Sequence, residues 1–152
     1  MAVRFYDVHA EPYGVLSNFS KHPLTLDGIW YPTAEHAFQA AKFAGQPTFE
    51  TIRRQRGAKD VARMARECRK LVRSDWDDAR DAVMARVLAA KFGGHADLRE
   101  LLIATGAEPI EFASPMDGYW GTGRDGLGRN RMGRLLEDLR STLVGRPPVD
   151  QP

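Results

Sequence analysis

The segment from Tyr31 to Phe43 carries a carboxylate, an amide and an amine at a spacing that brings them together. Glu35, Gln39 and Lys42 stand at positions i, i+4 and i+7, so on a helix they share one face. A separate apolar stripe, which can seat the helix in a core, is formed by Ala34, Ala37, Phe38 and Ala41. The polar face is either a stripe turned to water or a site for acid–base and nucleophilic chemistry.

A second carboxylate, Asp117, precedes a turn glycine and two aromatic residues, Tyr119 and Trp120. Aspartate in this context is typical of an Asx turn, with the aromatic rings covering a core. The alternative is a carboxylate beside rings on which a base can stack. The glycines that follow, and the start of a helix after Asn130, offer backbone N–H groups to a phosphate. We expect this loop to line the same cavity as Glu35.

The same loop contains Gly121-Thr-Gly123-Arg-Asp-Gly126, which reads as G-x-G-x-x-G. A dinucleotide fingerprint must lie at the first turn of a β-α-β unit, with an acidic residue about 20 residues further on. Here the motif lies near the end of the chain, followed by one helix and no strand. The four histidines also lack the spacing of metal ligands. The sequence therefore predicts neither a cofactor nor a metal.

The chain that positions these groups has 152 residues, which suits one domain with a real core. Its composition, 43% hydrophobic and 28% charged, is ordinary for a soluble globular protein. We expect no membrane span and no secretory signal, which makes the cytoplasm the expected compartment. The net charge is only +2, but arginine and lysine concentrate between Arg53 and Arg73. That run is either a solvated helix face or a surface for an anionic partner.

Helices dominate the elements that periodicity and capping signals predict. The expected helices span residues 33–44, 58–70, 74–92, 97–104 and 131–144. The expected strands span residues 3–6 and 109–112, with a hairpin over 24–31 that turns at Asp27-Gly28. Because strands and helices do not alternate, we predict the α+β class, with a few short strands and no βαβ unit. We predict one domain over residues 1–144 and a flexible tail over 145–152.

Several segments, taken in order, resemble the NADAR, or YbiA-like, family. They are Leu16-Ser-Asn-Phe19, the helix from Tyr31 to Phe43, Asp75-Trp76, Leu88-Ala-Ala-Lys-Phe92, Ser114-Pro-Met-Asp-Gly-Tyr-Trp-Gly121 and Gly128-Arg-Asn-Arg-Met-Gly133. The resemblance covers about Phe5 to Leu143. It departs mildly at Thr122 and Met132, where bulkier aliphatic residues are common.

The resemblance implies hydrolysis of the bond between ribose C1′ and an amine nitrogen. One branch of the family acts on phosphoribosylated pyrimidine intermediates of riboflavin synthesis, and another removes ADP-ribose from guanine bases. The expected substrate is therefore a phosphorylated ribosyl base or an ADP-ribosylated guanine, which a nucleic acid can carry. A non-catalytic module that binds ADP-ribose or nucleotides is the alternative, and a basic nucleic-acid-binding protein is a third.

The family positions and the residue chemistry together define the candidate site. The expected catalytic residues are Glu35, Lys42 and Asp117. The expected substrate contacts are Asn18, Phe19, Gln39, Trp76, Tyr119, Trp120, Gly121, Arg124 and Asn130. Glu35 and Asp117 can share acid–base work, in an order that the sequence leaves open. Alternatively, Lys42 attacks a ring-opened imine and forms a Schiff base, which requires a lowered pKa. Lys91 is the rival lysine, unless it is only a surface charge.

Overall fold

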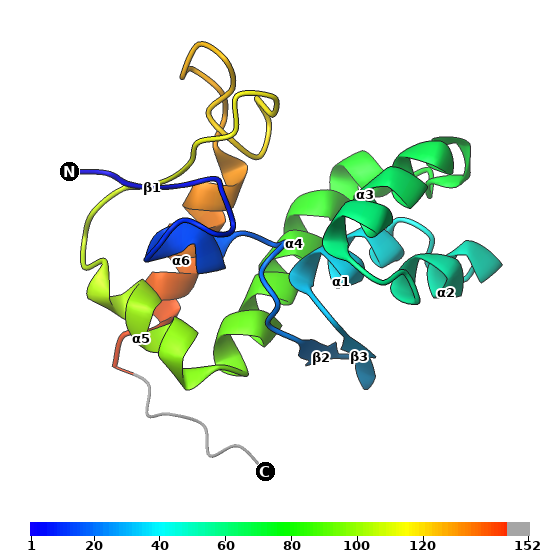
Figure 1. Ribbon diagram of the computed structural model, residues 1–152, viewed down its shortest axis with the longest axis horizontal. Helices are drawn as coiled ribbons and strands as arrows, with labels where there is room; N and C mark the ends of the chain where they lie inside the picture. Colours follow the sequence, from blue (N-terminus) through cyan, green and yellow to red (C-terminus); the bar gives the residue numbers. More distant parts are fainter. Residues whose placement is uncertain (146–152) are drawn as a thin grey trace. The chain divides into compact units, whose positions relative to one another are not determined.

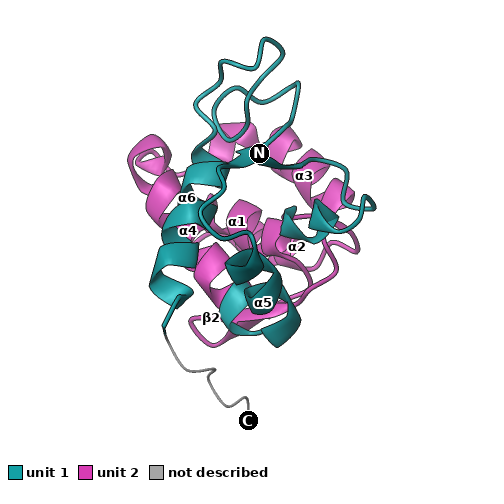
Figure 2. Ribbon diagram, turned by 90° about the vertical axis from the view of Figure 1, so that its left-hand side faces the viewer, with its two compact units in different colours: residues 1–17, 92–152 teal, residues 18–91 magenta. Residues whose placement is uncertain are grey.

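The computed structural model describes residues 1–145 and divides them into two compact units, which Figure 2 colours separately. Unit 1 combines residues 1–17 with the chain from Phe92 onward, and unit 2 comprises residues 18–91. The described residues form six α-helices, two 3-10 helices and four short strands. The predicted α+β class is confirmed. The predicted boundary at residue 144 stays a prediction, and residues 146–152 of the expected tail lie outside the described residues.

Unit 2 begins with the predicted hairpin. Strands β2 (Leu24–Leu26) and β3 (Ile29–Tyr31) are antiparallel, and Leu24 faces Tyr31 across the pair. The turn residues Asp27 and Gly28 have φ values of 53° and 78°. Both angles lie in the left-handed region that a two-residue hairpin turn requires, which is why Asp-Gly forms it.

Helix α1 (Ala34–Ala41) follows the hairpin and packs against α2 (Pro47–Arg53) and α3 (Ala58–Glu67), as Figure 1 shows. Its predicted N-cap is confirmed, because the Thr33 side chain accepts a hydrogen bond from the backbone N–H of His36 at 3.2 Å. The helix ends three residues earlier than expected. Its last turn tightens instead, with N–H groups of Lys42 and Phe43 donating three residues back.

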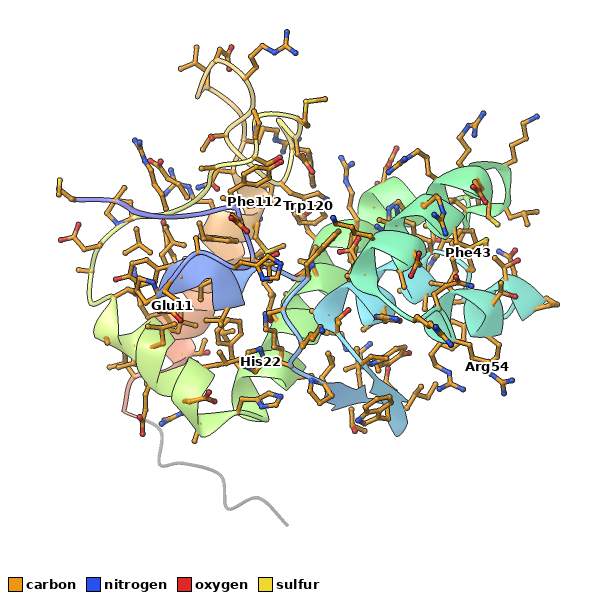
Figure 3. All side chains as sticks on the ribbon, viewed as in Figure 1. Glu11, His22, Phe43, Arg54, Phe112 and Trp120 are labelled. Atoms are coloured by element: carbon orange, nitrogen blue, oxygen red, sulfur yellow. The ribbon has the colours of Figure 1, made fainter. Side chains whose placement is uncertain are left out.

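Two further helical segments of unit 2 differ from the prediction. Helix α2 was not predicted, although it begins at a proline, which favours the first helical position. The basic helix expected over residues 58–70 is divided into α3 and the short 3-10 helix η2 (Arg69–Leu71). Phe43, labelled in Figure 3, is fully buried in this unit.

Helix α4 (Trp76–Gly93) is the long helix that the sequence predicts, and all but its last two residues belong to unit 2. Aspartates in its first turn, Asp77 and Asp78, favour this start because the helix dipole stabilises negative charge there.

Unit 1 contains a parallel strand pair that the sequence did not predict. Strand β1 (Val3–Phe5) pairs with β4 (Ile110–Phe112), and the Phe5 and Phe112 rings stack at 5.2 Å between centroids. The paired residues lie 107 positions apart, so local sequence patterns hold no sign of the pairing. Helices α1 to α5 lie between the strands in the chain, in place of a single crossover helix.

The remaining elements of unit 1 are the 3-10 helix η1 (Tyr13–Leu16), α5 (Ala96–Ala104) and α6 (Arg131–Leu143). Helix α6 packs on β4 and α5. Its buried Arg140 donates to the Thr105 hydroxyl and to the Glu108 carbonyl, each at 2.8 Å. The Arg140 guanidinium is therefore hydrogen-bonded within the fold, and it forms part of the core of unit 1.

Candidate active site

Glu35 lies in the first turn of α1 with only 8% of its surface exposed. Its backbone N–H donates to the Asn18 carbonyl at 3.0 Å, which fixes the start of the helix against the preceding segment. The Gln39 side-chain nitrogen donates to a Glu35 carboxylate oxygen at 2.8 Å. The i, i+4 spacing thus brings Glu35 and Gln39 together on one face of α1, as the sequence predicts, and Gln39 orients the buried acid.

Lys42 is the C-terminal cap of α1 and reaches over two aromatic rings. Its Nζ lies 5.8 Å from the Phe38 ring centroid and 5.7 Å from that of Trp76. The two rings are themselves in contact, with centroids 5.2 Å apart. An ammonium group at these distances interacts with the ring faces. Trp76 is therefore placed beside the α1 site, as expected, and Phe38 is a member that the sequence analysis assigned only to the core.

Burial lowers the pKa of Lys42 below its usual value, and the nearby Glu35 carboxylate partly opposes this by favouring the charged amine. A lower pKa increases the fraction of neutral amine at a given pH. The direction of the change is the one that a nucleophilic lysine requires.

The carbonyl of Asn18 accepts the backbone hydrogen bond from Glu35, so the two residues are neighbours in space. Asn18 is 7% exposed. Its side-chain nitrogen donates to the Met84 sulfur on α4 at 3.4 Å. Met84 was missed by the sequence analysis, because nothing in the local pattern links it to residue 18. Phe19, the next residue, is half-buried in the same unit. Unit 2 therefore brings Asn18, Glu35, Gln39, Lys42 and Trp76 into one connected group.

Of the two alternatives for Lys91, the rival lysine or only a surface charge, the surface charge is wrong. Lys91 has no exposed surface, and burial lowers its pKa from 10.5 to about 7. It stands seven residues after Met84 on α4, so both side chains point from the same face of that helix. Lys91 is thus a fully buried amine in the same unit as the half-buried Lys42.

Asp117 belongs to unit 1, where it organises the loop after β4. One of its carboxylate oxygens accepts from the backbone N–H groups of Tyr119 at 3.0 Å and Trp120 at 2.8 Å. The Asx-turn interpretation is therefore confirmed. The Tyr119 and Trp120 rings meet edge to face at 4.9 Å, and Trp120 is labelled in Figure 3. A catalytic role for Asp117, and a cavity that it shares with Glu35, stay predictions.

The loop does not leave the start of α6 open to an anion. Four consecutive backbone N–H groups, those of residues 129–132, donate to carbonyl oxygens of residues 118–121 at 2.8 to 3.0 Å. The hypothesis that these groups hold phosphate is therefore wrong, since a donor already paired within the fold is not free for a ligand.

Two predicted contact residues of this loop have clear roles in the fold. The Asn130 amide accepts from Phe112 N–H and donates to the Ile110 carbonyl, both at 2.9 Å, which ties β4 to α6. At Gly121 a β-carbon would lie 2.7 Å from the Phe112 carbonyl oxygen, so no larger residue fits there. Their contacts with substrate stay predictions.

An open groove of about 520 Å³ lies on this loop, and Arg124 is the only cation among its lining residues. The groove is lined by Pro115, Met116, Gly118, Gly123, Arg124, Asp125, Leu127 and Gly128. The exposed Arg124 side chain is thus the one member of the loop site that is placed to attract a phosphate group.

Within residues 1–145, no three His, Cys, Asp or Glu side chains are grouped so that they could hold a metal ion. In the same part of the chain, none of the helices combines the length and apolar character needed to cross a membrane.

Comparison with known proteins agrees with the fold. Residues 4–144 match the model of the NADAR domain family. N-glycosidase YbiA of Shigella flexneri serotype 5b (strain 8401) is 42% identical over 142 residues, which cover 93% of this chain and 88% of that protein. The riboflavin biosynthesis protein PYRR, chloroplastic, of Zea mays is 36% identical over 152 residues, covering 90% of this chain and 24% of that protein. The solution NMR structure of Escherichia coli YbiA is 41% identical, with a TM-score of 0.86 over 94% of this chain and 84% of that chain.

Proposed function

The chain belongs to the NADAR domain family, and we propose that it hydrolyses the bond between ribose C1′ and an amine nitrogen of a phosphoribosylated or ADP-ribosylated base. The names N-glycosidase and riboflavin biosynthesis protein, carried by relatives at 42% and 36% identity, support this reaction class. The observation that carries the proposal is the group in unit 2, where α1 carries a buried acid near an amine of lowered pKa, and the amine lies over the Trp76 ring.

The first step that this group supports is protonation of the leaving group. An amine leaves poorly as an anion, so a proton must reach the nitrogen as the C1′–N bond breaks. Glu35 is the proposed donor, because it is buried and its carboxyl group is oriented by Gln39. In the direct route, the oxygen of water bonds to C1′ and its proton goes to a base, for which Asp117 is the candidate.

Lys42 supports a covalent route. The ribosyl amine opens to an imine, and the neutral Nζ of Lys42 adds to C1′. The base amine then leaves with a proton from Glu35, and the C1′ carbon stays bound to Nζ as an imine. Water hydrolyses that imine, which releases the sugar as an aldehyde and restores the amine. The lowered pKa of Lys42 favours this addition.

Lys91 is the rival nucleophile, because its pKa of about 7 leaves much of it neutral near neutral pH. Lys42 is preferred because it lies over Trp76 and Phe38 and its pKa responds to the charge of Glu35. Borohydride trapping followed by peptide mass spectrometry distinguishes the two, since the ribosyl adduct remains on the lysine that attacked.

The proposed activity is tested by incubating the protein with a phosphoribosylaminopyrimidine and, separately, with ADP-ribosylated guanosine in DNA. We expect mass spectrometry to detect ribose 5-phosphate from the first or ADP-ribose from the second, and Glu35→Gln to release neither. Binding of both compounds without release by the wild type would refute the enzyme proposal in favour of a non-catalytic module.

A further inference from the structure

Two side-chain amides, those of Asn18 and Gln39 beside Glu35, each hold a buried oxygen without a partner. Among the residues that the structure describes, no donor lies within hydrogen-bond distance of Asn18 Oδ1 or Gln39 Oε1. The nitrogens of the same two amides are both paired. The Asn18 nitrogen donates to the Met84 sulfur, and the Gln39 nitrogen donates to a Glu35 carboxylate oxygen. Both oxygens are therefore acceptors that the fold itself leaves unused.

The orientation of each amide follows from its partner. The Met84 thioether can only accept a hydrogen bond, and the Gln39 nitrogen donates to a Glu35 carboxylate oxygen, so each amide turns its nitrogen toward its partner. This leaves the oxygen of each amide on its other side. Asn18 and Gln39 are tied to the same residue, the first through the Glu35 backbone N–H at 3.0 Å and the second through the carboxylate at 2.8 Å.

Such acceptors destabilise a folded chain, because water is removed from the oxygen and no donor replaces it. Buried polar groups without a partner are rare in proteins and call for a functional explanation. Here two of them flank the acid to which the proposed reaction is assigned. A ligand that brings donors would satisfy both, and a ligand without donors would leave them unpaired.

Building on the proposed function, we propose that Asn18 and Gln39 set substrate specificity by accepting hydrogen bonds from N–H or O–H groups next to the scissile C1′–N bond. The donors belong either to the base, as amino and ring N–H groups, or to the ribose, as hydroxyls. In both cases the site selects a ligand rich in donors. The negative ends of the two amide dipoles also favour the positive charge that develops at C1′ as the bond breaks.

The test uses the full chain and two probes that represent the halves of the substrate. Isocytosine (2-aminopyrimidin-4-one) carries the base donors, and ribose 5-phosphate carries the hydroxyls. The variants are Asn18→Leu and Gln39→Met, which keep similar volume and remove the acceptor. Gln55→Met is the matched control, because the Gln55 nitrogen, just beyond the end of α2, donates to the Thr51 carbonyl of that helix at 3.0 Å. Binding is measured by titration calorimetry.

We expect each site variant to weaken binding of one probe about three- to tenfold, the effect of one hydrogen bond, and Gln55→Met to change neither. The probe that loses affinity identifies whether base or sugar supplies the donor. Asn18→Leu is the decisive variant, since Gln39→Met also removes the hydrogen bond to Glu35. The melting temperature of Asn18→Leu should change little, because its oxygen has no partner in the free protein and its nitrogen loses only the 3.4 Å contact with the Met84 sulfur.

Two results would overturn the proposal. Wild-type affinity of both variants for both probes would mean that ordered water, and not a ligand, satisfies the two oxygens. Failure of both probes to bind the wild type at millimolar concentration would also exclude a site that accepts hydrogen bonds from donors of a ligand. Because the titration requires no turnover, donor-dependent binding without product release would contradict the proposed function and leave this inference standing.

Discussion

Replacement of the buried Lys91 by methionine should flatten the pH dependence of the protein's unfolding. In the folded chain the pKa of this amine is about 7, whereas a solvated lysine has a value of 10.5. Between these two pH values the unfolded state binds the proton and the folded state releases it. The free energy of unfolding therefore rises with pH across this window, and the full cost of burying the amine is present below pH 7.

The size of the effect follows from the same two values. A fall from 10.5 to about 7 corresponds to up to about 5 kcal/mol of differential stability. Methionine has a similar length and no charge, so the stability of Lys91→Met relative to the wild type should be higher at pH 6 than at pH 10 by up to this amount. Urea unfolding followed by circular dichroism at pH 6, 7, 8 and 9 measures it directly, with exposed Lys59→Met as the control. The reasoning is refuted if the difference between variant and wild type is the same at pH 6 and pH 9.

The other predictions concern the proposed chemistry. Glu35→Gln should lower turnover at least about a hundredfold at an unchanged melting temperature, because the amide keeps the shape and an acceptor for Gln39 while losing the proton; near-normal kcat would remove Glu35 from the mechanism. Lys42→Ala should be inactive under the covalent route, and borohydride should trap an adduct on Lys42 of the wild type; substantial turnover without an adduct would favour direct attack by water. Asp117→Asn should keep the two backbone hydrogen bonds at residues 119 and 120, and hence stability, whereas Asp117→Ala should lose about 1–3 kcal/mol. An active Asp117→Asn enzyme would show that this carboxylate serves only the loop. Activity is also expected to survive a chelator, and its loss with recovery on adding a divalent ion would contradict a reaction without metal.

Local features of this protein were predictable because their causes lie within a few residues. Asp27-Gly28 supplies left-handed backbone angles, so the hairpin follows from two residues. Thr33 caps α1, and the spacing of Glu35, Gln39 and Lys42 places them on one face of that helix. The sequence also predicted the Asx turn at Asp117, because a side chain that binds its own following backbone needs no distant partner.

Tertiary structure alone decided which groups are buried and which donors and acceptors are already paired. The pairing of β1 with β4 joins segments 107 positions apart, and no local pattern encodes it. Lys91 reads as a surface charge in a helix, yet packing removes it from water and lowers its pKa. The N–H groups at the start of α6 look available for phosphate until the loop carbonyls are seen to occupy them. Composition and spacing fix which chemical groups a chain carries, whereas their solvation and partners depend on contacts between segments distant in the sequence.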